Sequence, residues 1–314
     1  MKDITINGTN IAPGENKIVT FSKYELPSQS IIETPAYVFR SVNEGPTVLL
    51  SAGMHGEETN GIETIRQLIK RDDVQKPLCG TIIAIPVFNV VSFIFNQRDL
   101  PDGRDLNRCF PGTKNGSLGS RIAHDIMHNI LPVIDFGVDF HTGGAKINNY
   151  PQLRCMFDEP KHIEIAKLFS PPFIINATYR EGSFRMEAAK QGKSILVFEA
   201  GESLRFNNTA IHEGLMGCLR LLKNLNMIDA KVEETHTIVI GKDKWLRAPE
   251  AGLFRTHKKF GSFFEKDEVI GTINDPYNKS EIKITAPDNG FIIGVNNQPV
   301  VHVGDALLHI GIEK

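Results

Sequence analysis

Four short apolar runs, separated by segments of helical periodicity, constrain the fold of this chain more than any other feature. Within each run the residues are apolar at successive positions, so both faces of the predicted strand are buried. The runs are Thr47–Ala52, Thr81–Ile85, Gly137–Phe140 and Ser194–Phe198. Helical spacing is found between them at Asn60–Arg71, Arg121–Ile130 and His162–Phe169. Such strands require helices on both faces of their sheet, which predicts a three-layer α/β/α domain with a mixed central sheet.

The two ends of the sequence differ from this central part in their pattern of apolar and turn-forming residues. The first 40 or so residues alternate weakly and contain several turn formers, which predicts a short β region. From about Thr235 onward, short β runs and turns replace helical periodicity, and the segment Ala248–Leu253 is echoed by Ala286–Phe291. Two related β halves resemble the barrel-sandwich of lipoyl carrier domains, although the carrier motif Met-Lys-Met is missing. We therefore predict a large domain at residues 1–234 and a small all-β domain at residues 235–314.

The charge and composition of the chain argue against several classes of function. Of its 314 residues, 35 are basic and 37 are acidic, and no basic run is present, so we expect no nucleic-acid partner. No apolar stretch approaches the roughly 18 residues of a membrane span, and the N-terminus lacks the layout of a signal peptide. The four cysteines form no CxxC pair and are expected to be reduced thiols. We therefore expect a cytoplasmic protein with a small-molecule partner, and homo-oligomer formation stays open.

Each apolar run leads into a segment rich in charged or amide side chains. His55 and Glu58 follow the first run, His141 follows the third, and Glu199 follows the fourth. The second run leads, over a longer connection, to Asn89, Arg98, Asp105, Asn107 and Arg108. In open α/β sheets, ligands bind outside the carboxyl ends of the strands. If the four strands are neighbours, these polar side chains converge at one rim of the sheet.

Two histidines and one carboxylate, with a fourth position left open, are the ligand set of a catalytic zinc ion. The pair His55-x-x-Glu58 lies where a loop enters a predicted helix, so both side chains can turn toward one point. Neighbouring glycines let the backbone come close to a metal. Taken alone, an HxxE pair is often found at the start of a helix without binding a metal. A single histidine at a strand end, such as His141, usually forms only hydrogen bonds. The joint arrangement is far more specific for a metal site.

Four segments together resemble the succinylglutamate desuccinylase/aspartoacylase family, whose members are zinc deacylases related to metallocarboxypeptidases. They are Ser51–Gly61 (SAGMHGEETNG), Asp105–Arg108 (DLNR), Asp139–Gly144 (DFHTGG) and Phe198–Gly201 (FEAG). The resemblance runs in order from about Ala36 to Leu222. Within it, Arg98–Gly112 looks most like a branch of bacterial predicted deacylases that is diverse in substrate. We therefore do not transfer aspartoacylase specificity to this chain.

The resemblance implies a metal-dependent amidohydrolase that removes an acyl group from a small N-acylated amino acid or related amine. It implies one Zn²⁺ per chain, bound by His55, Glu58 and His141. Glu199 would be the general base that takes a proton from the zinc-bound water. Arg98 would stabilise the tetrahedral oxyanion, a role suited to a permanently charged, planar donor.

The same resemblance indicates how a substrate would be held. Asn107 and Arg108 would bind a substrate carboxylate, with the arginine forming a bidentate fork. Arg185, which precedes Glu199 in the chain, is a further candidate for substrate binding, although a surface salt bridge explains it equally well. The C-terminal β domain would roof the active site and exclude long chains, and Tyr277 is a candidate lid residue there.

Several alternatives stay open at this point. Glu57 could replace Glu58 as the ligand, and Glu202 could replace Glu199 as the base. Asp105 and Asp139 fit hydrogen-bond partners of the ligands better than ligands themselves. A metallocarboxypeptidase acting on short peptides is the nearest alternative enzyme. A non-catalytic protein that binds a metal or ligand on a hydrolase scaffold is the alternative from another class.

Overall fold

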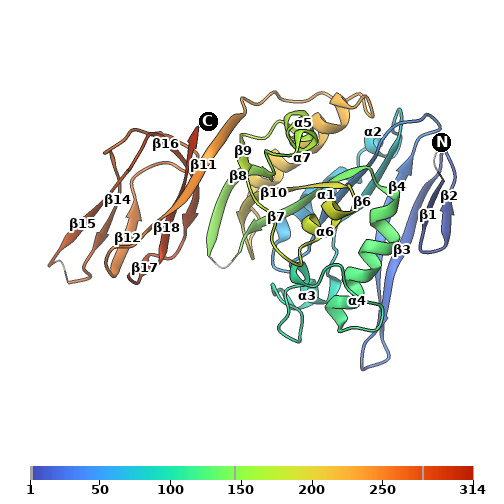
Figure 1. Ribbon diagram of the computed structural model, residues 1–314, viewed down its shortest axis with the longest axis horizontal. Coiled ribbons are helices and arrows are strands. Elements are labelled where there is room, and N and C mark those ends of the chain that lie inside the picture. Colours follow the sequence, from blue (N-terminus) through green and yellow to red (C-terminus); the bar gives the residue numbers. More distant parts are fainter. Residues whose placement is uncertain (1–2, 145, 278, 314) are drawn as a thin grey trace.

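The structure, a computed structural model, describes residues 3–144, 146–277 and 279–313 (Figure 1). Its central feature is a sheet in which the four predicted strands are neighbours, in the order β10-β7-β5-β6 and all parallel. Antiparallel strands flank them, so the predicted mixed α/β fold is confirmed. The strands of this part are β3 (Asn16–Glu25), β4 (Ile31–Arg40), β5 (Thr47–Ala52), β6 (Thr81–Ile85), β7 (Phe136–Gly143), β8 (Ile147–Cys155), β9 (Phe173–Asn176) and β10 (Ser194–Glu202).

Helices cover both faces of this sheet, because each face presents an apolar layer. One core joins α4 and α6 to the sheet, and the other joins α1, α5 and α7 to the opposite face. The helices are α1 (Thr59–Leu68), α2 (Asp72–Gln75), α3 (Val90–Phe95), α4 (Leu118–Asp125), α5 (Pro160–Phe169), α6 (Phe184–Lys190) and α7 (Asn208–Asn224), with short 3-10 or π turns at Leu106–Arg108, Ile126–Ile130 and Leu131–Val133. None of the described helices has the length and apolar character needed to cross a membrane.

The close approach of α1 to the sheet fixes the segment that carries the predicted metal ligands. A side chain at Gly61 would put its Cβ only 2.5 Å from the Cβ of Phe140 on β7, so only glycine allows this packing. Ile65 and Leu68, one helical turn apart, bury the inner face of α1. Because Glu58 immediately precedes α1, the packing of this helix places the Glu58 side chain over the end of β7.

The N-terminal and C-terminal regions consist of strands. Residues 3–40 contain the hairpin β1 (Ile4–Ile6) and β2 (Thr9–Ile11) together with β3 and β4. From Ile238 onward the regular elements of the described chain are all strands. They are β11 (Ile238–Arg247), β12 (Gly252–Thr256), β13 (Phe263–Phe264), β14 (Val269–Asn274), β15 (Glu281–Thr285), β16 (Gly290–Asn296), β17 (Val300–Val301) and β18 (Ala306–Glu313). All four cysteines are free thiols, as predicted.

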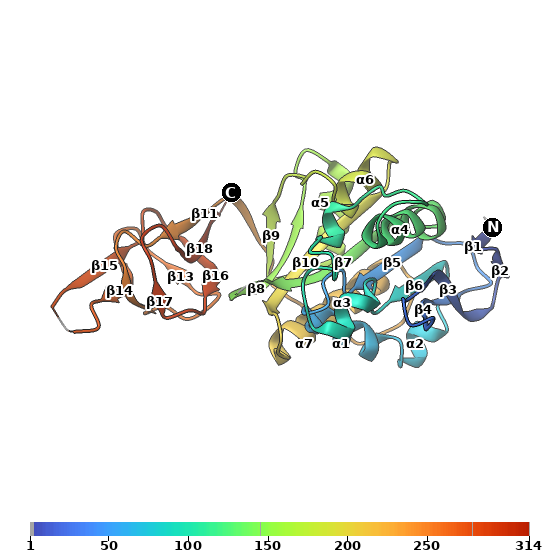
Figure 2. The same cartoon turned by 90° about the horizontal axis from the view of Figure 1, so that it is seen from below.

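The main sheet continues into this C-terminal region instead of stopping at its border. β11 pairs with β9 and then with β18, and β16 pairs with both β18 and β8. The strands β12, β14, β15 and β17 form a separate sheet. Figures 1 and 2 show the C-terminal strands at one end of the molecule, beside β8 and β9, with the β14–β15 hairpin farthest out. Tyr277 lies in that hairpin and is 80% exposed. A roof over the active site stays a prediction.

Candidate metal centre and active site

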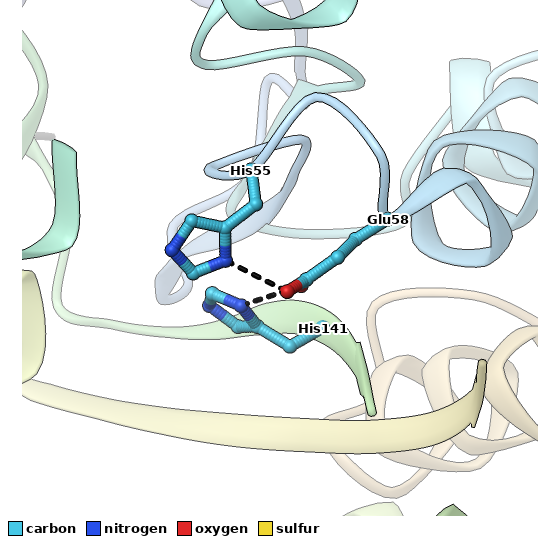
Figure 3. A group of neighbouring side chains, drawn as sticks. All are labelled: His55, Glu58 and His141. Carbon is cyan, nitrogen blue, oxygen red and sulfur yellow. Dashed lines mark hydrogen bonds and ion pairs between the residues drawn. The ribbon is translucent and has the colours of Figure 1, made fainter. Parts of the chain in front are cut away.

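His55, Glu58 and His141 converge at the carboxyl edge of the parallel strands (Figure 3). The loop after β5 carries His55 and Glu58, and His141 lies near the end of β7, the neighbour of β5. All three are buried, with exposed fractions of 2%, 2% and 6% in that order. The structure therefore brings the predicted ligand set together in one place.

The donor atoms of this cluster fit a divalent metal of the zinc type. Nδ1 of His55 lies 2.8 Å from Oε1 of Glu58, and Nδ1 of His141 lies 2.9 Å from Oε2 of the same carboxylate. One ligand atom from each residue lies within 4.8 Å of the other two. Two imidazole nitrogens and one carboxylate are a zinc donor set that leaves a coordination position for water or substrate. Among the described residues, this is the one group of three or more such side chains.

A second carboxylate orients each histidine. Nε2 of His55 lies 2.9 Å from Oδ1 of Asp105, and Nε2 of His141 lies 2.9 Å from Oδ2 of Asp139. Each aspartate accepts a hydrogen bond from Nε2 of its histidine, so Nδ1 is the nitrogen that faces Glu58 and would bind a metal in place of a proton. Asp139 is fixed in turn by the hydroxyl of Ser51, at 2.8 Å. Asp105 and Asp139 therefore contact the histidines as predicted, and their role in metal binding stays a prediction.

The electrostatics of the cluster favour a bound cation, either a proton or a metal ion. Burial alone would raise the pKa of the Glu58 carboxyl, but the charges of His55 and His141 and their hydrogen bonds hold it well below its usual range. Burial opposes protonation of His141, whereas Asp139 and Glu58 raise its pKa. A metal competes with protons for the same nitrogen atoms, so metal binding at this cluster would release protons.

Replacing Asp139 or Asp105 with Asn should weaken zinc binding by about 10- to 100-fold, because the amide no longer fixes the histidine tautomer. Competition with a chromogenic chelator measures the affinity. Asp102→Asn is the matched control, because Asp102 lies in the same loop as Asp105 but pairs with Arg104 at 3.7 Å. Wild-type zinc affinity in both variants would contradict the orienting role.

Arg98 lies beside the metal cluster and forms ion pairs with the carboxylates of Glu58 and Asp105. Its Nη1 is 3.2 Å from Oε1 of Glu58, and its Nη2 is 2.9 Å from Oδ2 of Asp105. The side chain keeps 36% of its surface exposed. A guanidinium in this place is held rigidly and still faces solvent, which suits the role predicted for Arg98.

Glu199 shares the sheet face of the metal cluster. β10 pairs with β7 in parallel, and Glu199 stands opposite His141 in the register. Side chains of paired residues project to the same face of a sheet. The carboxylate of Glu199 accepts a hydrogen bond from Nδ2 of Asn149 at 2.9 Å and pairs with Nη1 of Arg154 at 3.3 Å. Both partners lie on β8, a strand that the sequence analysis did not identify.

The remaining predicted site residues lie in the 3-10 turn Leu106–Arg108 and at the start of α6, which are joined by a hydrogen bond. Oδ1 of Asn107 accepts a hydrogen bond from the backbone N–H of Phe184 at 3.0 Å, at the start of α6. Arg108 is exposed, and its Nη1 donates to the carbonyl of Asn107 at 2.5 Å. Arg185 is 9% exposed, and its Nη2 donates to the carbonyls of Ala177 and Thr178. Its Nη1 is buried and has no hydrogen-bond partner.

Comparison with known proteins identifies the family. The model of the succinylglutamate desuccinylase/aspartoacylase catalytic domain matches residues 44–225, a span that contains every residue of the site described above. The chain therefore belongs to the succinylglutamate desuccinylase/aspartoacylase family. The resemblance noted in the sequence is confirmed, and the matched span is the part of the fold that holds the cluster.

A curated relative and several solved structures extend the comparison. An N-alpha-acetyl-L-2,4-diaminobutyric acid deacetylase of Halomonas elongata is 32% identical over 196 residues, which are 55% of this chain and 56% of the relative. The match thus spans little more than half of either protein. A succinylglutamate desuccinylase/aspartoacylase structure from Rhodobacter sphaeroides is 26% identical, with 95% of both chains covered and a TM-score of 0.80. A product-bound ectoine utilization protein from Ruegeria pomeroyi shares the fold, with 21% identity, 99% of both chains covered and a TM-score of 0.82.

The geometry also distinguishes two predicted residues, Glu58 and Glu199, from the alternatives that the sequence left open, Glu57 and Glu202. Glu58, and not Glu57, contacts both histidines. Glu202 pairs with Arg205 at 3.2 Å and accepts a hydrogen bond from Asn297, whereas Glu199 stands opposite His141 in the register. The predicted choice within each pair therefore agrees with the geometry.

Proposed function

We propose that this chain is a zinc-dependent deacylase that hydrolyses the amide bond of small N-acyl amino acids. The observation that carries the proposal is the buried cluster of two histidines and one carboxylate, with Glu199 on the same sheet face. The family supports an amide-hydrolysing activity. The Halomonas elongata relative, a deacetylase named for an N-acetylated amino acid, supports this class of substrate.

Different residues of the chain would bind the metal, transfer the proton and stabilise the oxyanion during amide hydrolysis. His55, Glu58 and His141 would hold the zinc ion, which supplies Lewis-acid chemistry by polarising an amide carbonyl and acidifying water. Glu199 would accept a proton from the attacking water and return it to the leaving amine. The guanidinium of Arg98 would donate hydrogen bonds to the carbonyl oxygen as negative charge develops on it.

A substrate carboxylate would explain the arginines near the site. Arg185 is a buried cation, and in the parts of the chain that the structure describes no carboxylate pairs with it. Burial lowers the pKa of Arg185, because the charged guanidinium loses water without gaining an anion. Its inward Nη1 lacks a partner, and a bidentate carboxylate is the ligand that a guanidinium fork matches best. Arg108 lies on the adjoining loop, where it could contact the same group.

Arg108→Ala and Arg185→Lys should each lower kcat/KM about 10- to 100-fold on an N-acetyl amino acid, in line with the loss of a charged hydrogen bond. The same variants should lose little on an N-acetyl amine of equal length that has no carboxylate. Arg104→Ala is the control, because Arg104 is 62% exposed on the same loop as Arg108. Equal losses on both substrates would mean that these arginines support the fold or the transition state.

The alternative peptidase activity is tested with the same wild-type enzyme. A screen of N-acetyl, N-succinyl and N-formyl amino acids against short peptides with free carboxyl ends compares the two substrate classes. We expect the acyl amino acids to be hydrolysed faster, since the C-terminal strands are predicted to narrow the entrance. Faster cleavage of the peptides would mean that the chain is a carboxypeptidase and not a deacylase.

A further inference from the structure

Two side chains of β8 hold the carboxylate of Glu199, one at each of its oxygens. Nδ2 of Asn149 donates a hydrogen bond to Oε2 at 2.9 Å, and Nη1 of Arg154 forms an ion pair with Oε1 at 3.3 Å. Asn149 is buried, and the side chains of Arg154 and Glu199 keep 25% and 14% of their surface exposed. The carboxylate therefore cannot rotate or turn away from β8 without breaking one of these contacts.

A β-bulge in β8 brings Asn149 to the sheet face of Glu199. Glu199 on β10 stands opposite Gln152 on β8, whereas Gly201, two residues farther along β10, stands opposite Asn149, three residues back on β8. The extra residue on β8 is the mark of a bulge, which re-aims the side chains that follow it. With regular pairing Tyr150 would stand opposite Gly201, and Asn149 would point to the other face of the sheet.

No competing partner accounts for these two side chains. Among the described residues, Glu199 is the one ion-pair partner of Arg154. Oδ1 of Asn149 is buried without a partner, so its amide is fixed through Nδ2 alone. Gln152, which stands directly opposite Glu199, donates instead to the carbonyl of Ile293 at 3.1 Å. An ion pair that is partly exposed contributes little to the stability of a fold, so orientation of Glu199 explains the arrangement better than stability does.

We propose that Arg154 and Asn149 are positioning residues that together orient the carboxylate of Glu199 toward the attacking water. The inference rests on the proposed function, in which Glu199 is the general base. A base must lie within hydrogen-bond reach of the proton that it accepts, and a misplacement of about 1 Å can slow a reaction by about 100-fold. Each carboxylate oxygen has a second lone pair, so the two contacts leave Glu199 able to accept that proton.

Double-mutant cycles with Glu199→Gln test this role. Arg154→Ala and Asn149→Ala should each lower kcat by about 10- to 100-fold, the range for loss of a hydrogen bond to a charged group. KM should stay within about twofold, and zinc content should equal that of the wild type. In the Glu199→Gln background the same substitutions should change kcat less than about twofold, because they act only through the carboxylate. Arg205→Ala is the matched control, since Arg205 pairs with Glu202 on the same strand as Glu199.

Chemical rescue separates positioning from a structural role of Arg154. Guanidinium chloride at millimolar concentration should restore part of the kcat lost in Arg154→Ala, because the free ion can occupy the place of the missing side chain and pair with Glu199. Sodium chloride of equal ionic strength should not, and neither salt should restore kcat in the double variant with Glu199→Gln. If Arg154→Ala does not fold, Arg154→Met keeps an unbranched stem and should show the same loss and the same cycle.

The outcomes decide the role of each residue separately. For either one, wild-type kcat, or a loss that is as large in the Glu199→Gln background as in the wild type, would overturn its positioning role. Wild-type kcat in Glu199→Gln itself would instead overturn the proposed function, so the two failures are distinguishable.

Discussion

Glu199→Gln is expected to lower kcat by at least about 100-fold, the usual contribution of a positioned general base, while zinc content stays at the wild-type level. Glutamine keeps the size of the side chain and an oxygen that can accept the hydrogen bond from Asn149. It cannot accept the proton of the attacking water. Single-turnover kinetics on an N-acetyl amino acid measure the loss, and metal analysis of the same sample measures the zinc.

Glu202→Gln is the matched control for this experiment. Glu202 ends the same strand but pairs with Arg205, so its replacement should change kcat only slightly. If Glu199→Gln loses its zinc instead, Glu199 is a ligand, and the roles of Glu58 and Glu199 must be exchanged. Unchanged kcat with full zinc occupancy would mean that another group accepts the proton.

The ligand cluster was predictable from the sequence because it depends on local patterns. His55, Glu58, His141 and Glu199 each follow an apolar run that is readable over about five residues. Parallel strands have their carboxyl ends at one edge, so the convergence of these side chains required only that the strands be neighbours. The structure confirms that adjacency for β5, β7 and β10.

The strand β8 was not predictable in the same way, although it lies inside the sheet. Its sequence contains Asn149, Gln152 and Arg154, and Pro151 interrupts it, so it shows neither a continuous apolar run nor clean alternation. Proline is tolerated there because the pairing of β8 with β10 shifts register at this point. An arginine in a strand between apolar neighbours was the one available signal for Arg154, and it is a weak one.

The pairing of C-terminal strands with β8 and β9 was likewise beyond sequence patterns. Periodicity indicates that a segment is a strand, but it does not give the partner or the register across a large sequence separation. The pairing of Asn149 with Gly294 and of Gly294 with His309 is of this long-range kind. For this reason the C-terminal neighbours of β8 were missed.

His55→Ala and His141→Ala should each abolish most zinc binding, which in the wild type should amount to about one ion per chain. Removing either imidazole leaves two protein ligands, too few for a tight site, and leaves Glu58 as a buried carboxylate with one partner fewer. Metal analysis after dialysis gives the stoichiometry. Activity should be lost in parallel.

Thermal unfolding separates loss of the metal from loss of the fold. A ligand that binds only the native state raises stability with its concentration, so zinc added to metal-free wild type should raise Tm. The same addition should not change the Tm of His141→Ala. His128→Ala is the matched control, because His128 is exposed and its Nδ1 donates a hydrogen bond to the carbonyl oxygen of His124. If both ligand variants retain full zinc occupancy and the zinc-dependent rise in Tm, the metal lies elsewhere, and the roles of Glu199 and Arg98, which follow from its position, would have to be reassigned.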